Sequence, residues 1–470
     1  MELYILNMKF TRLLERYNQA VARYTSYPTV PHWYEWPAIE TELTGQCGGS
    51  ELLKWEASVK QTFRLQNRPD GISLYIHLPY CELLCTYCAC NKKITTNHAV
   101  EEPYIQAVLA EWAMYTALFP EKPIIRELHL GGGTPTFFSA QNLKNLITGL
   151  LASSELHPAF EFGFEGHPNN TSREQLQTLF DQGFRRVSFG VQDLDSEVQR
   201  IINRIQPLEN LIEVTLAARE IGYDSINYDL IYGLPKQNSN RLALTLDKVL
   251  ALRPDRIAYY SYAHIPWKSK AQRLYNENDL PTTDEKMALY LQGREAFQQA
   301  GYTDIGMDHF ALPNEPLAMA ARENRLHRNF MGYTSTQSRL LIGLGVSSIS
   351  DAAIAYAQNT RELGHYLRKT AAGEWPLNKG YFLNREDQLN RRHILDISCT
   401  GKTVLEHDFE LSQAANHFLI QLLTDDLIQF DGSTLIVTPK GKLFTRNICS
   451  LFDAYLWGSE FTPKRYSQAI

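Results

Sequence analysis

The sequence has few of the features that mark membrane, secreted or nucleic-acid-binding proteins. No apolar run approaches the roughly 18 residues of a membrane span. The stretch from Met1 to Arg23 lacks the uninterrupted apolar centre and small-residue cleavage site of a signal peptide. With 52 acidic and 46 basic residues, the net charge of -6 gives no strong positive field for a nucleic acid. We therefore expect a cytoplasmic protein without a membrane span or a nucleic-acid partner.

Cysteine is scarce and unevenly distributed. Only seven cysteines occur in 470 residues, and four of them lie between Cys81 and Cys90. An odd number with this clustering does not suit a disulfide framework and favours a reducing compartment. The length predicts about two or three domains, and the absence of a heptad pattern favours a monomer.

Cys81, Cys85 and Cys88 have the spacing Cys-x3-Cys-x2-Cys and directly follow the apolar run 72–78. Three thiolates on one loop suit a metal cluster that takes three protein ligands and keeps one position free. Iron–sulfur clusters are the main use of closely spaced thiolates. Structural zinc sites usually take four ligands, with the second pair far along the chain. The zinc alternative would use Cys90 as the fourth ligand.

From residue 71 onward, short apolar runs alternate with longer segments of helical periodicity. This alternation predicts βα units and a parallel sheet, and six such units can curl into part of a barrel. The expected strands are residues 72–78, 126–130, 160–165, 186–191, 225–231 and 256–262, and the expected helices are residues 103–119, 141–152, 173–182, 209–222 and 242–252.

Polar or backbone-exposing residues follow every expected strand. In a barrel the carboxyl ends of the strands meet on one face, where active sites form, so these residues predict a single site. The glycines at 131–133 let a backbone approach a ligand closely. Glu165, Gln192 and Asp229 can accept hydrogen bonds from ribose hydroxyls or an ammonium group. Arg204 can form a two-point pair with a carboxylate. A salt bridge to a neighbouring helix is the alternative for each single acid.

The βα alternation stops near residue 300. The expected fold class is α/β, a partial (β/α)6 barrel with an N-terminal arm and a mostly helical C-terminal domain. In the last part we expect a hairpin at residues 428–438 and a helix at 440–457. The four expected parts are an irregular arm and lid at residues 1–70, the barrel core at 71–310, a barrel extension and pocket wall at 311–365, and the C-terminal domain at 366–470.

The order of these motifs resembles that of the radical S-adenosylmethionine (radical SAM) superfamily, whose members carry Cys-x3-Cys-x2-Cys after the first barrel strand. Within it, the chain is similar to the oxygen-independent coproporphyrinogen III oxidases, also called coproporphyrinogen dehydrogenases. The resemblance extends from about residue 20 to 457. The segments that carry it are YIHLPYC (75–81), GGGTPT (131–136), GVQD (190–193), DLIYGLP (229–235), RYTSYPT (23–29), GMDHF (306–310), HRNF (327–330) and RNIC (446–449).

This resemblance implies an oxidoreductase of porphyrin and heme biosynthesis that works without oxygen. The implied reaction converts two propionates of coproporphyrinogen III to vinyl groups by oxidative decarboxylation. It proceeds through a 5′-deoxyadenosyl radical and gives protoporphyrinogen IX. A donor such as flavodoxin or ferredoxin is implied for the electrons. Because a carbon radical reacts with solvent, we expect a closed mouth, with residues 23–29 and the C-terminal domain as lids. Arg23 and Arg328 are expected to contact the substrate propionates.

The resemblance also assigns site residues. One [4Fe-4S] cluster per chain is implied on Cys81, Cys85 and Cys88, with the free iron position open to the methionine moiety of S-adenosylmethionine. Tyr75, Cys90 and His309 are the implied catalytic residues. One S-adenosylmethionine, and a second beside it, are implied at Tyr75, Tyr87, Gly132, Gly133, Thr134, Glu165, Gln192, Arg204, Asp229, Ala263, Phe330, Met331 and Ile349.

Two positions depart from the family pattern. Met331 stands where a glutamine is expected, and methionine cannot make the hydrogen bonds of an amide. It can still pack against a sulfonium methyl group or an adenine ring. Tyr87 stands where a phenylalanine is expected and keeps the aromatic face. The second S-adenosylmethionine site is the part of the pattern that these changes affect.

Three alternatives stay open. A heme chaperone of the same superfamily would carry heme without oxidising its precursor. Such proteins typically lack the extra cysteine after the third ligand, the RYTSYPT arm and the HRNF segment, and this chain has all three. A radical methyltransferase that opens heme also lacks the full set. The third alternative is a structural zinc protein.

Overall fold

A computed structural model describes residues 12–36, 49–267 and 269–458. Its centre is a 13-stranded sheet in which six consecutive strands run parallel and pair in chain order. These strands confirm the expected α/β fold built on a partial (β/α)6 barrel. They are β2 (Ile72–Leu78), β5 (Ile124–Gly132), β6 (Glu155–Gly166), β7 (Phe184–Gln192), β8 (Ser225–Tyr232) and β9 (Arg256–Ser261).

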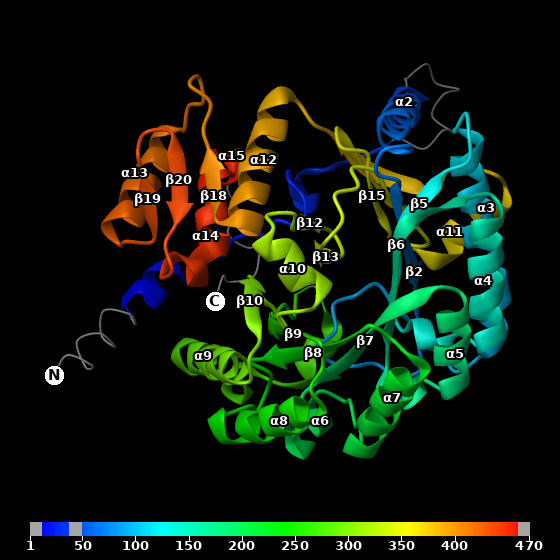
Figure 1. The fold of residues 1–470 in the computed structure, drawn as a ribbon, viewed down its shortest axis with the longest axis horizontal. Helices are drawn as coiled ribbons and strands as arrows, with labels where there is room; N and C mark the ends of the chain where they lie inside the picture. The colour runs from blue at the N-terminus through cyan, green and yellow to red at the C-terminus, as the bar shows by residue number, and fades with distance from the viewer. Residues whose placement is uncertain (1–11, 37–48, 268, 459–470) are drawn as a thin grey trace.

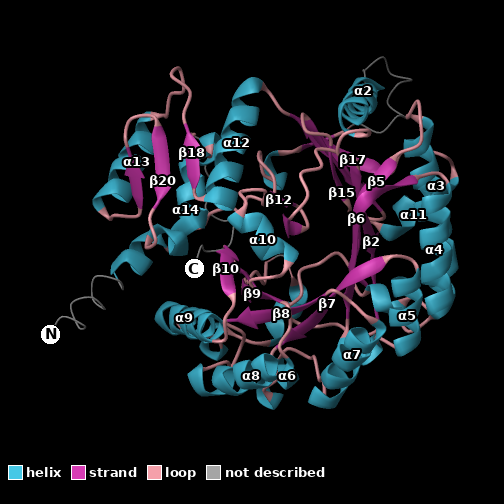
Figure 2. Cartoon of the chain, viewed as in Figure 1, coloured by secondary structure: helices cyan, strands magenta, loops and turns pink. Residues whose placement is uncertain are grey.

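Helices follow the parallel strands and form an outer layer that runs from the right of the molecule along its lower edge in this view (Figures 1 and 2). Several begin where a polar side chain caps the first turn. Ser172 and Thr282, for example, each take part in a capping box with the residue three positions later. The helices of this layer are α3 (Glu101–Ala117), α4 (Ala140–Ala152), α5 (Arg173–Asp181), α6 (Ser196–Ile201), α7 (Leu208–Ile221), α8 (Ser239–Leu252) and α9 (Thr283–Gln299).

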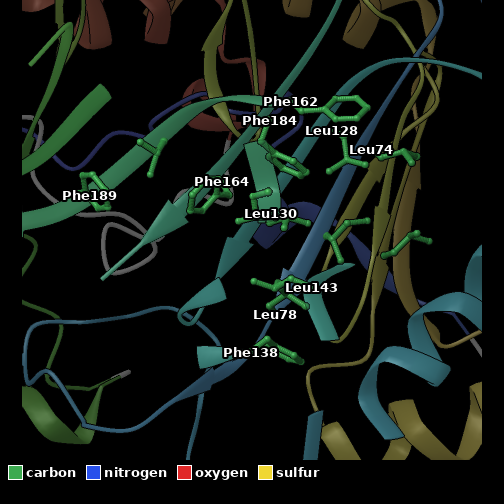
Figure 3. Close-up of a cluster of buried hydrophobic side chains, with 14 of the residues drawn as sticks. Leu74, Leu78, Leu128, Leu130, Phe138, Leu143, Phe162, Phe164, Phe184 and Phe189 are labelled. Carbon is green, nitrogen blue, oxygen red and sulfur yellow. The ribbon is translucent and has the colours of Figure 1, made fainter. Parts of the chain in front are cut away.

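The strands send alternate side chains to two different environments, as the period of a strand requires. One set is apolar and packs under the helices, where Leu128, Leu130 and Phe164 meet Leu143 of α4 in one buried cluster (Figure 3). The other set is polar and points into the barrel, as Glu127 and His129 do. Because the strands are in register, this alternation lines the barrel interior with groups that can bind or react.

The sheet continues beyond the six barrel strands on both sides. β14 (Leu341–Leu344) adds a parallel strand beside β2, followed outward by β15 (Ile349–Asp351), β16 (Ala355–Asn359), β17 (Leu377–Phe382) and β1 (Tyr34–Glu35). On the other side, β11 (His309–Ala311) pairs with β9, and β10 (Thr303–Gly306) with β11.

The predicted boundary at residue 366 falls inside α11 (Leu363–Ala371), and the main sheet extends past it to β17. The reason is packing. Tyr366 of α11 is fully buried, and its hydroxyl donates a 2.7 Å hydrogen bond to Glu111 of α3. This segment is therefore bound to the barrel rather than to the C-terminal part.

The expectation that residues 1–70 are irregular is wrong for α2 (Gly49–Gln66). Trp55, Val59 and Phe63 are fully buried and recur every four residues, so they lie on one face of this helix. Phe63 stacks on Phe119 with ring centroids 3.9 Å apart. Residues 12–17 are also helical, whereas residues 1–11 and 37–48 of the expected arm lie outside the described residues.

The C-terminal part packs around a second core that also contains the N-terminal arm. Tyr17 is fully buried against Phe418 and Phe444, and Asn447 donates a hydrogen bond to its carbonyl. The elements are α12 (Arg385–Thr400), β18 (Lys402–Val404), α13 (Gln413–Thr424), β19 (Ile428–Phe430), β20 (Thr434–Val437), α14 (Thr445–Cys449) and α15 (Ala454–Trp457). The expected hairpin is β19–β20, but the expected helix at 440–457 is broken into short helical pieces. None of the described helices combines the length and apolarity needed to cross a membrane.

Candidate active site

The cysteine loop lies at the carboxyl end of β2. β3 (Tyr80–Cys81) pairs with β4 (Lys93–Ile94), so the chain between them closes into a loop. Residues after α6 hold this loop from the other side of the barrel mouth. The Thr86 N–H donates to the carbonyl of Ile202 (3.0 Å), and the Asn203 amide donates to the carbonyl of Leu84 (2.8 Å).

A hollow of about 420 Å³ opens beneath the loop at the barrel mouth. It brings together residues that are separated by up to 179 positions in the chain, from Cys81 to Tyr260. Its lining includes all three expected cluster ligands and nine further residues predicted for the site. These are Cys81, Cys85, Cys88, Tyr87, Cys90, Gly132, Gly133, Thr134, Glu165, Gln192, Arg204 and Asp229.

The three ligand cysteines lie in different local environments. Burial raises the pKa of Cys81 to about 11, although Thr134 Oγ1 lies 3.3 Å from its sulfur. Arg204 Nη1 donates to the sulfur of Cys85 at 3.5 Å. The pKa of Cys88 falls to about 6, chiefly through its hydrogen bond with Cys90 and also through the charge of Lys92.

Among the described residues, no three His, Cys, Asp or Glu side chains converge as one metal ion would require. In a four-iron cluster each cysteine binds a different iron, so the ligands surround the cluster rather than meet at a point. A loop with three thiol groups along one hollow fits this second arrangement. The donor set therefore fits an iron–sulfur cluster.

The glycine turn after β5 passes directly beneath the cysteine loop. Gly132 has a positive φ of 113°, which glycine adopts without strain. A Cβ at Gly133 would lie 2.6 Å from the carbonyl group of Pro79. The Gly133 N–H donates to the carbonyl of Leu78 (2.8 Å), and the Thr134 N–H donates to the carbonyl of Tyr80 (3.0 Å). Only glycine permits so close a packing of this turn on the strand that leads to Cys81.

Glu165 lies at the carboxyl end of β6 with its side chain 43% exposed toward the hollow. The surrounding protein raises the pKa of its carboxyl group. The hydrogen bond and charge of His129 and the N–H of Gly132 lower it by more, so the net pKa lies below its ordinary value. Glu165 is thus an anion at neutral pH and can accept a hydrogen bond from an ammonium or hydroxyl group.

Asp229 lies on β8, across the mouth from Glu165. Ser188 donates to its carboxylate at 3.0 Å and Asn227 at 2.9 Å. Burial and the negative charge of Glu165 nevertheless raise the pKa of Asp229 to about 6. The two acids of the hollow therefore titrate in different pH ranges.

Tyr75 lies below the cysteine loop and does not line the hollow. Its hydroxyl lies 3.3 Å from His77 Nδ1, and His77 Nε2 lies 2.8 Å from the carbonyl of Asn91. Because a carbonyl only accepts, we assign the proton of His77 to Nε2, and Nδ1 then accepts from Tyr75. This chain of hydrogen bonds connects Tyr75 to the residue that follows Cys90.

A second cavity of about 110 Å³ lies deeper in the barrel and shares Glu165, Asp229 and Tyr260 with the hollow. Two predicted residues, His309 and Met331, line this inner cavity instead of the hollow. Burial, together with the charges of three arginines, lowers the pKa of His309 to about 3. His309 is therefore a neutral group at physiological pH.

Three other predicted residues lie away from both cavities. Phe330 and Ile349 pack in an apolar cluster with Trp33 and Tyr356, where the Phe330 and Trp33 rings are 6.0 Å apart. Ala263 follows β9 and accepts a hydrogen bond from Gln272 through its carbonyl (3.2 Å). The same amide donates to the carbonyl of Tyr87 at 3.0 Å, so Gln272 connects Ala263 to the cysteine loop.

The N-terminal arm reaches the barrel mouth at β9. Arg23 donates to the carbonyl of Ser261 at 3.0 Å, and its guanidinium lies 5.9 Å from the ring centre of Tyr260. Arg328 donates to the carbonyls of Arg23 (2.6 Å) and Tyr24 (3.0 Å). Arg23 thus lies beside a residue that lines both cavities, whereas Arg328 holds the arm in place.

Sequence reasoning missed several residues of the site. His129, Ser188 and Asn227 were not assigned to it, and neither were Tyr260 and Gln272. The first three lie two or four residues from a predicted site residue, so strand alternation was the available signal. Tyr260 lies three positions before Ala263 and does not follow this spacing. Gln272 lies in a short 3-10 helix (Lys270–Leu274), and no pattern in the sequence indicates its contacts.

Known proteins resemble this chain over most of its length. The family model described as "Radical SAM superfamily" matches residues 75–249. The oxygen-independent coproporphyrinogen III oxidase of Pseudomonas aeruginosa is 36% identical over 469 residues, which cover 97% of this chain and 98% of that protein. The protein of the same name from Escherichia coli K12 is 38% identical over 453 residues, covering 94% and 95%.

The solved structures give the same result. The structure of Escherichia coli coproporphyrinogen III oxidase, described as a radical SAM enzyme, matches with a TM-score of 0.83 and 35% identity. The match covers 93% of this chain and all of the other. The similarity therefore includes the arm, the barrel and the C-terminal part together.

Proposed function

Because this chain belongs to the radical SAM superfamily and, within it, to the oxygen-independent coproporphyrinogen III oxidases, we propose that it converts two propionates of coproporphyrinogen III to vinyl groups. The product is protoporphyrinogen IX, and the enzyme is an oxidoreductase of heme biosynthesis. The single observation that carries this proposal is the hollow at the barrel mouth. It places three cysteines, a glycine turn and two acids that titrate in different pH ranges around one space.

The cofactors implied by the superfamily are a [4Fe-4S] cluster and S-adenosylmethionine. When bound, they would supply a 5′-deoxyadenosyl radical able to remove a hydrogen atom from a propionate β-carbon. Release of carbon dioxide and transfer of one electron to an acceptor would then leave the vinyl group. We propose that Cys81, Cys85 and Cys88 hold the cluster. Gly132 and Gly133 would present backbone groups to the methionine moiety.

Glu165 and Asp229 are proposed to bind the polar groups of S-adenosylmethionine. Glu165 is held as an anion by His129 and the Gly132 N–H, so it suits an ammonium group. Asp229 is oriented by two donors, Ser188 and Asn227, which leave it ready to accept from ribose hydroxyls. Gln192 has a positive φ of 66° and lies on the same rim. Arg204 is proposed to contact the methionine carboxylate.

The inner cavity is proposed to receive part of the substrate. Neutral His309 cannot attract a propionate by charge, so we propose that it acts through hydrogen bonding or proton transfer. Arg23 is the proposed propionate contact, because it lies beside Tyr260, which lines both cavities. Tyr75 and Cys90 are proposed to act near the reacting groups from the cluster side.

A second S-adenosylmethionine is proposed between the hollow and the inner cavity. Tyr87 lines the hollow and Met331 lines the inner cavity, whereas Phe330 and Ile349 pack away from both. Equilibrium dialysis of labelled S-adenosylmethionine against the reconstituted enzyme would measure its stoichiometry. Met331→Gln should raise that number if the missing amide limits the second site.

For the electrons we propose flavodoxin or ferredoxin as donor. We also propose that the enzyme is a cytoplasmic monomer. A monomer would be contradicted by a dimer mass in light scattering at micromolar concentration.

The test of the function is anaerobic reconstitution with iron and sulfide, followed by assay with coproporphyrinogen III, a reductant and S-adenosylmethionine. We expect porphyrin product and methionine together. Cys81→Ala should abolish both, whereas Cys399→Ala, which lies outside the hollow, should retain them. Activity in the Cys81→Ala variant would contradict the proposal. Tight heme binding without turnover would instead support the heme chaperone.

A further inference from the structure

Two of the three expected cluster ligands have a hydrogen-bonding partner at their sulfur atom that comes from outside the cysteine loop. Thr134 Oγ1 lies 3.3 Å from the sulfur of Cys81, and Arg204 Nη1 lies 3.5 Å from the sulfur of Cys85. A cysteine that binds iron is a thiolate and can only accept. In that state the Thr134 hydroxyl and the Arg204 guanidinium are necessarily the donors.

Both donors are held by contacts that do not depend on a ligand. The Thr134 N–H donates to Tyr80, next to Cys81, and Gly133 before it is packed on Pro79. Thr134 therefore has a fixed position relative to the sulfur of Cys81.

Arg204 is fixed in a similar way. The side chain of Arg204 is buried, and its Nη2 donates to the carbonyl of Gly190 at 2.5 Å. The backbone N–H of Arg204 donates to the carbonyl of Gln199 at 2.8 Å. The guanidinium thus connects the end of β7 with the cysteine loop. Nη1 donates to the sulfur of Cys85 while Nη2 keeps its hydrogen bond to Gly190 of the barrel.

We propose that Thr134 and Arg204 are positioning residues that donate hydrogen bonds to the ligand sulfurs of Cys81 and Cys85 and raise the reduction potential of the cluster. This inference rests on the cluster-binding part of the proposed function and on nothing that concerns the porphyrin. Reduction adds one negative charge, which spreads onto the ligand sulfurs. Donors aimed at these sulfurs stabilise the reduced form more than the oxidised form.

The two residues should differ in strength. Both bonds have a thiolate acceptor, but Thr134 offers a neutral hydroxyl, whereas Arg204 offers a charged donor in a buried position. The positive charge of Arg204 adds a direct attraction to the negative charge that reduction brings to the cluster. The effect of Arg204 should appear without S-adenosylmethionine. This distinguishes it from a role in binding the methionine carboxylate, which needs that ligand.

The experiment is a redox titration of the reconstituted full-length protein, followed by electron paramagnetic resonance of the reduced cluster, without S-adenosylmethionine or porphyrin. Thr134→Val removes the hydroxyl at nearly constant shape, and Thr134→Ser is its matched control. Arg204→Gln removes the charge, and Arg204→Lys keeps the charge but loses the planar fork. Iron and sulfide content is measured for each variant.

At a fixed solution potential we expect Thr134→Val to hold several-fold less reduced cluster than wild type, with Thr134→Ser close to wild type. For Arg204→Gln we expect the ratio of reduced to oxidised cluster to fall about tenfold, which corresponds to a reduction potential 59 mV lower for a one-electron couple. Arg204→Lys should lie between Arg204→Gln and wild type.

Equal potentials for Thr134→Val and Thr134→Ser, at full iron content, would overturn the assignment of Thr134. An unchanged potential in Arg204→Gln would overturn that of Arg204. If Arg204→Gln does not assemble a cluster, Arg204→Lys decides the question. A wild-type protein that binds no cluster would instead contradict the proposed function itself. If the variants shift the reduction potential as expected but the wild-type enzyme does not turn over the porphyrinogen, the role of Thr134 and Arg204 stands and the proposed oxidase function fails.

Discussion

His129 Nε2 lies 3.5 Å from Glu165 Oε1, across the neighbouring strands β5 and β6. Neither residue is close to the other in the chain, but the register of the two strands brings their inward-facing positions together. The Gly132 N–H also donates to the Glu165 carboxylate at 3.2 Å. These contacts keep a negative charge at the centre of the barrel mouth, where a cationic cofactor would bind.

The first prediction concerns this charge. Glu165→Gln should weaken S-adenosylmethionine binding about 10- to 100-fold, because a hydrogen bond to a charged group contributes about 1.5–3 kcal/mol. Anaerobic calorimetry on the reconstituted protein measures it. The control is Glu155→Gln, at the exposed start of the same strand. Equal affinities of the Glu165 variant and wild type would remove Glu165 from the site.

The second prediction concerns pH. The pKa of Asp229 is raised to about 6 by burial and by Glu165, so Asp229 ionises as the pH rises through that value. An ionised carboxylate is the better acceptor, and the affinity for S-adenosylmethionine should therefore increase about tenfold between pH 5 and pH 7.5. Asp229→Asn should bind more weakly and lose most of this dependence. A dependence that persists in Asp229→Asn would assign it to another group.

The third prediction separates Cys90 from the cluster ligands. Cys90→Ala should bind iron and sulfide at the wild-type ratio but lose turnover, because its proposed role is catalytic. Cys81→Ala should lose iron. Metal analysis after anaerobic reconstitution measures both. Loss of iron in Cys90→Ala would make Cys90 a ligand and revive the zinc-type arrangement of four cysteines.

The fourth prediction concerns the arm. Arg328→Met removes the two hydrogen bonds that Arg328 donates to the carbonyls of Arg23 and Tyr24. This should cost about 2–3 kcal/mol in local stability, and tryptic cleavage within residues 12–36 should accelerate about 30-fold or more. Arg322→Met, at an exposed position of α10 (Pro316–Arg322), should cleave as wild type does. Unchanged cleavage in Arg328→Met would show that other contacts hold the arm.

Local patterns allowed the barrel to be predicted from the sequence. The six parallel strands are short apolar runs, the first five each followed by an expected helix, and the structure confirms all six strands. Residues at the carboxyl ends of these strands could be assigned to one site because parallel strands end on the same face. Most of the residues predicted this way line the hollow.

Contacts between distant segments could not be predicted. β17 joins the sheet through pairing with β16, and Tyr17 enters the C-terminal core more than 400 positions away from Phe418 in sequence. Neither segment has a local sequence pattern that indicates which distant segment it contacts. The helix α2 is different, because the spacing of Trp55, Val59 and Phe63 was visible in the sequence and was missed.

The most direct test of the central claim is the stoichiometry of the anaerobic reaction. Coproporphyrinogen III labelled in its propionate carboxyl groups is incubated with the reconstituted enzyme, a reductant and S-adenosylmethionine, and methionine, carbon dioxide and porphyrin are measured together. We predict one carbon dioxide and at least one methionine for each vinyl group formed, with protoporphyrinogen IX as the final product. Methionine formed without release of carbon dioxide would contradict the account.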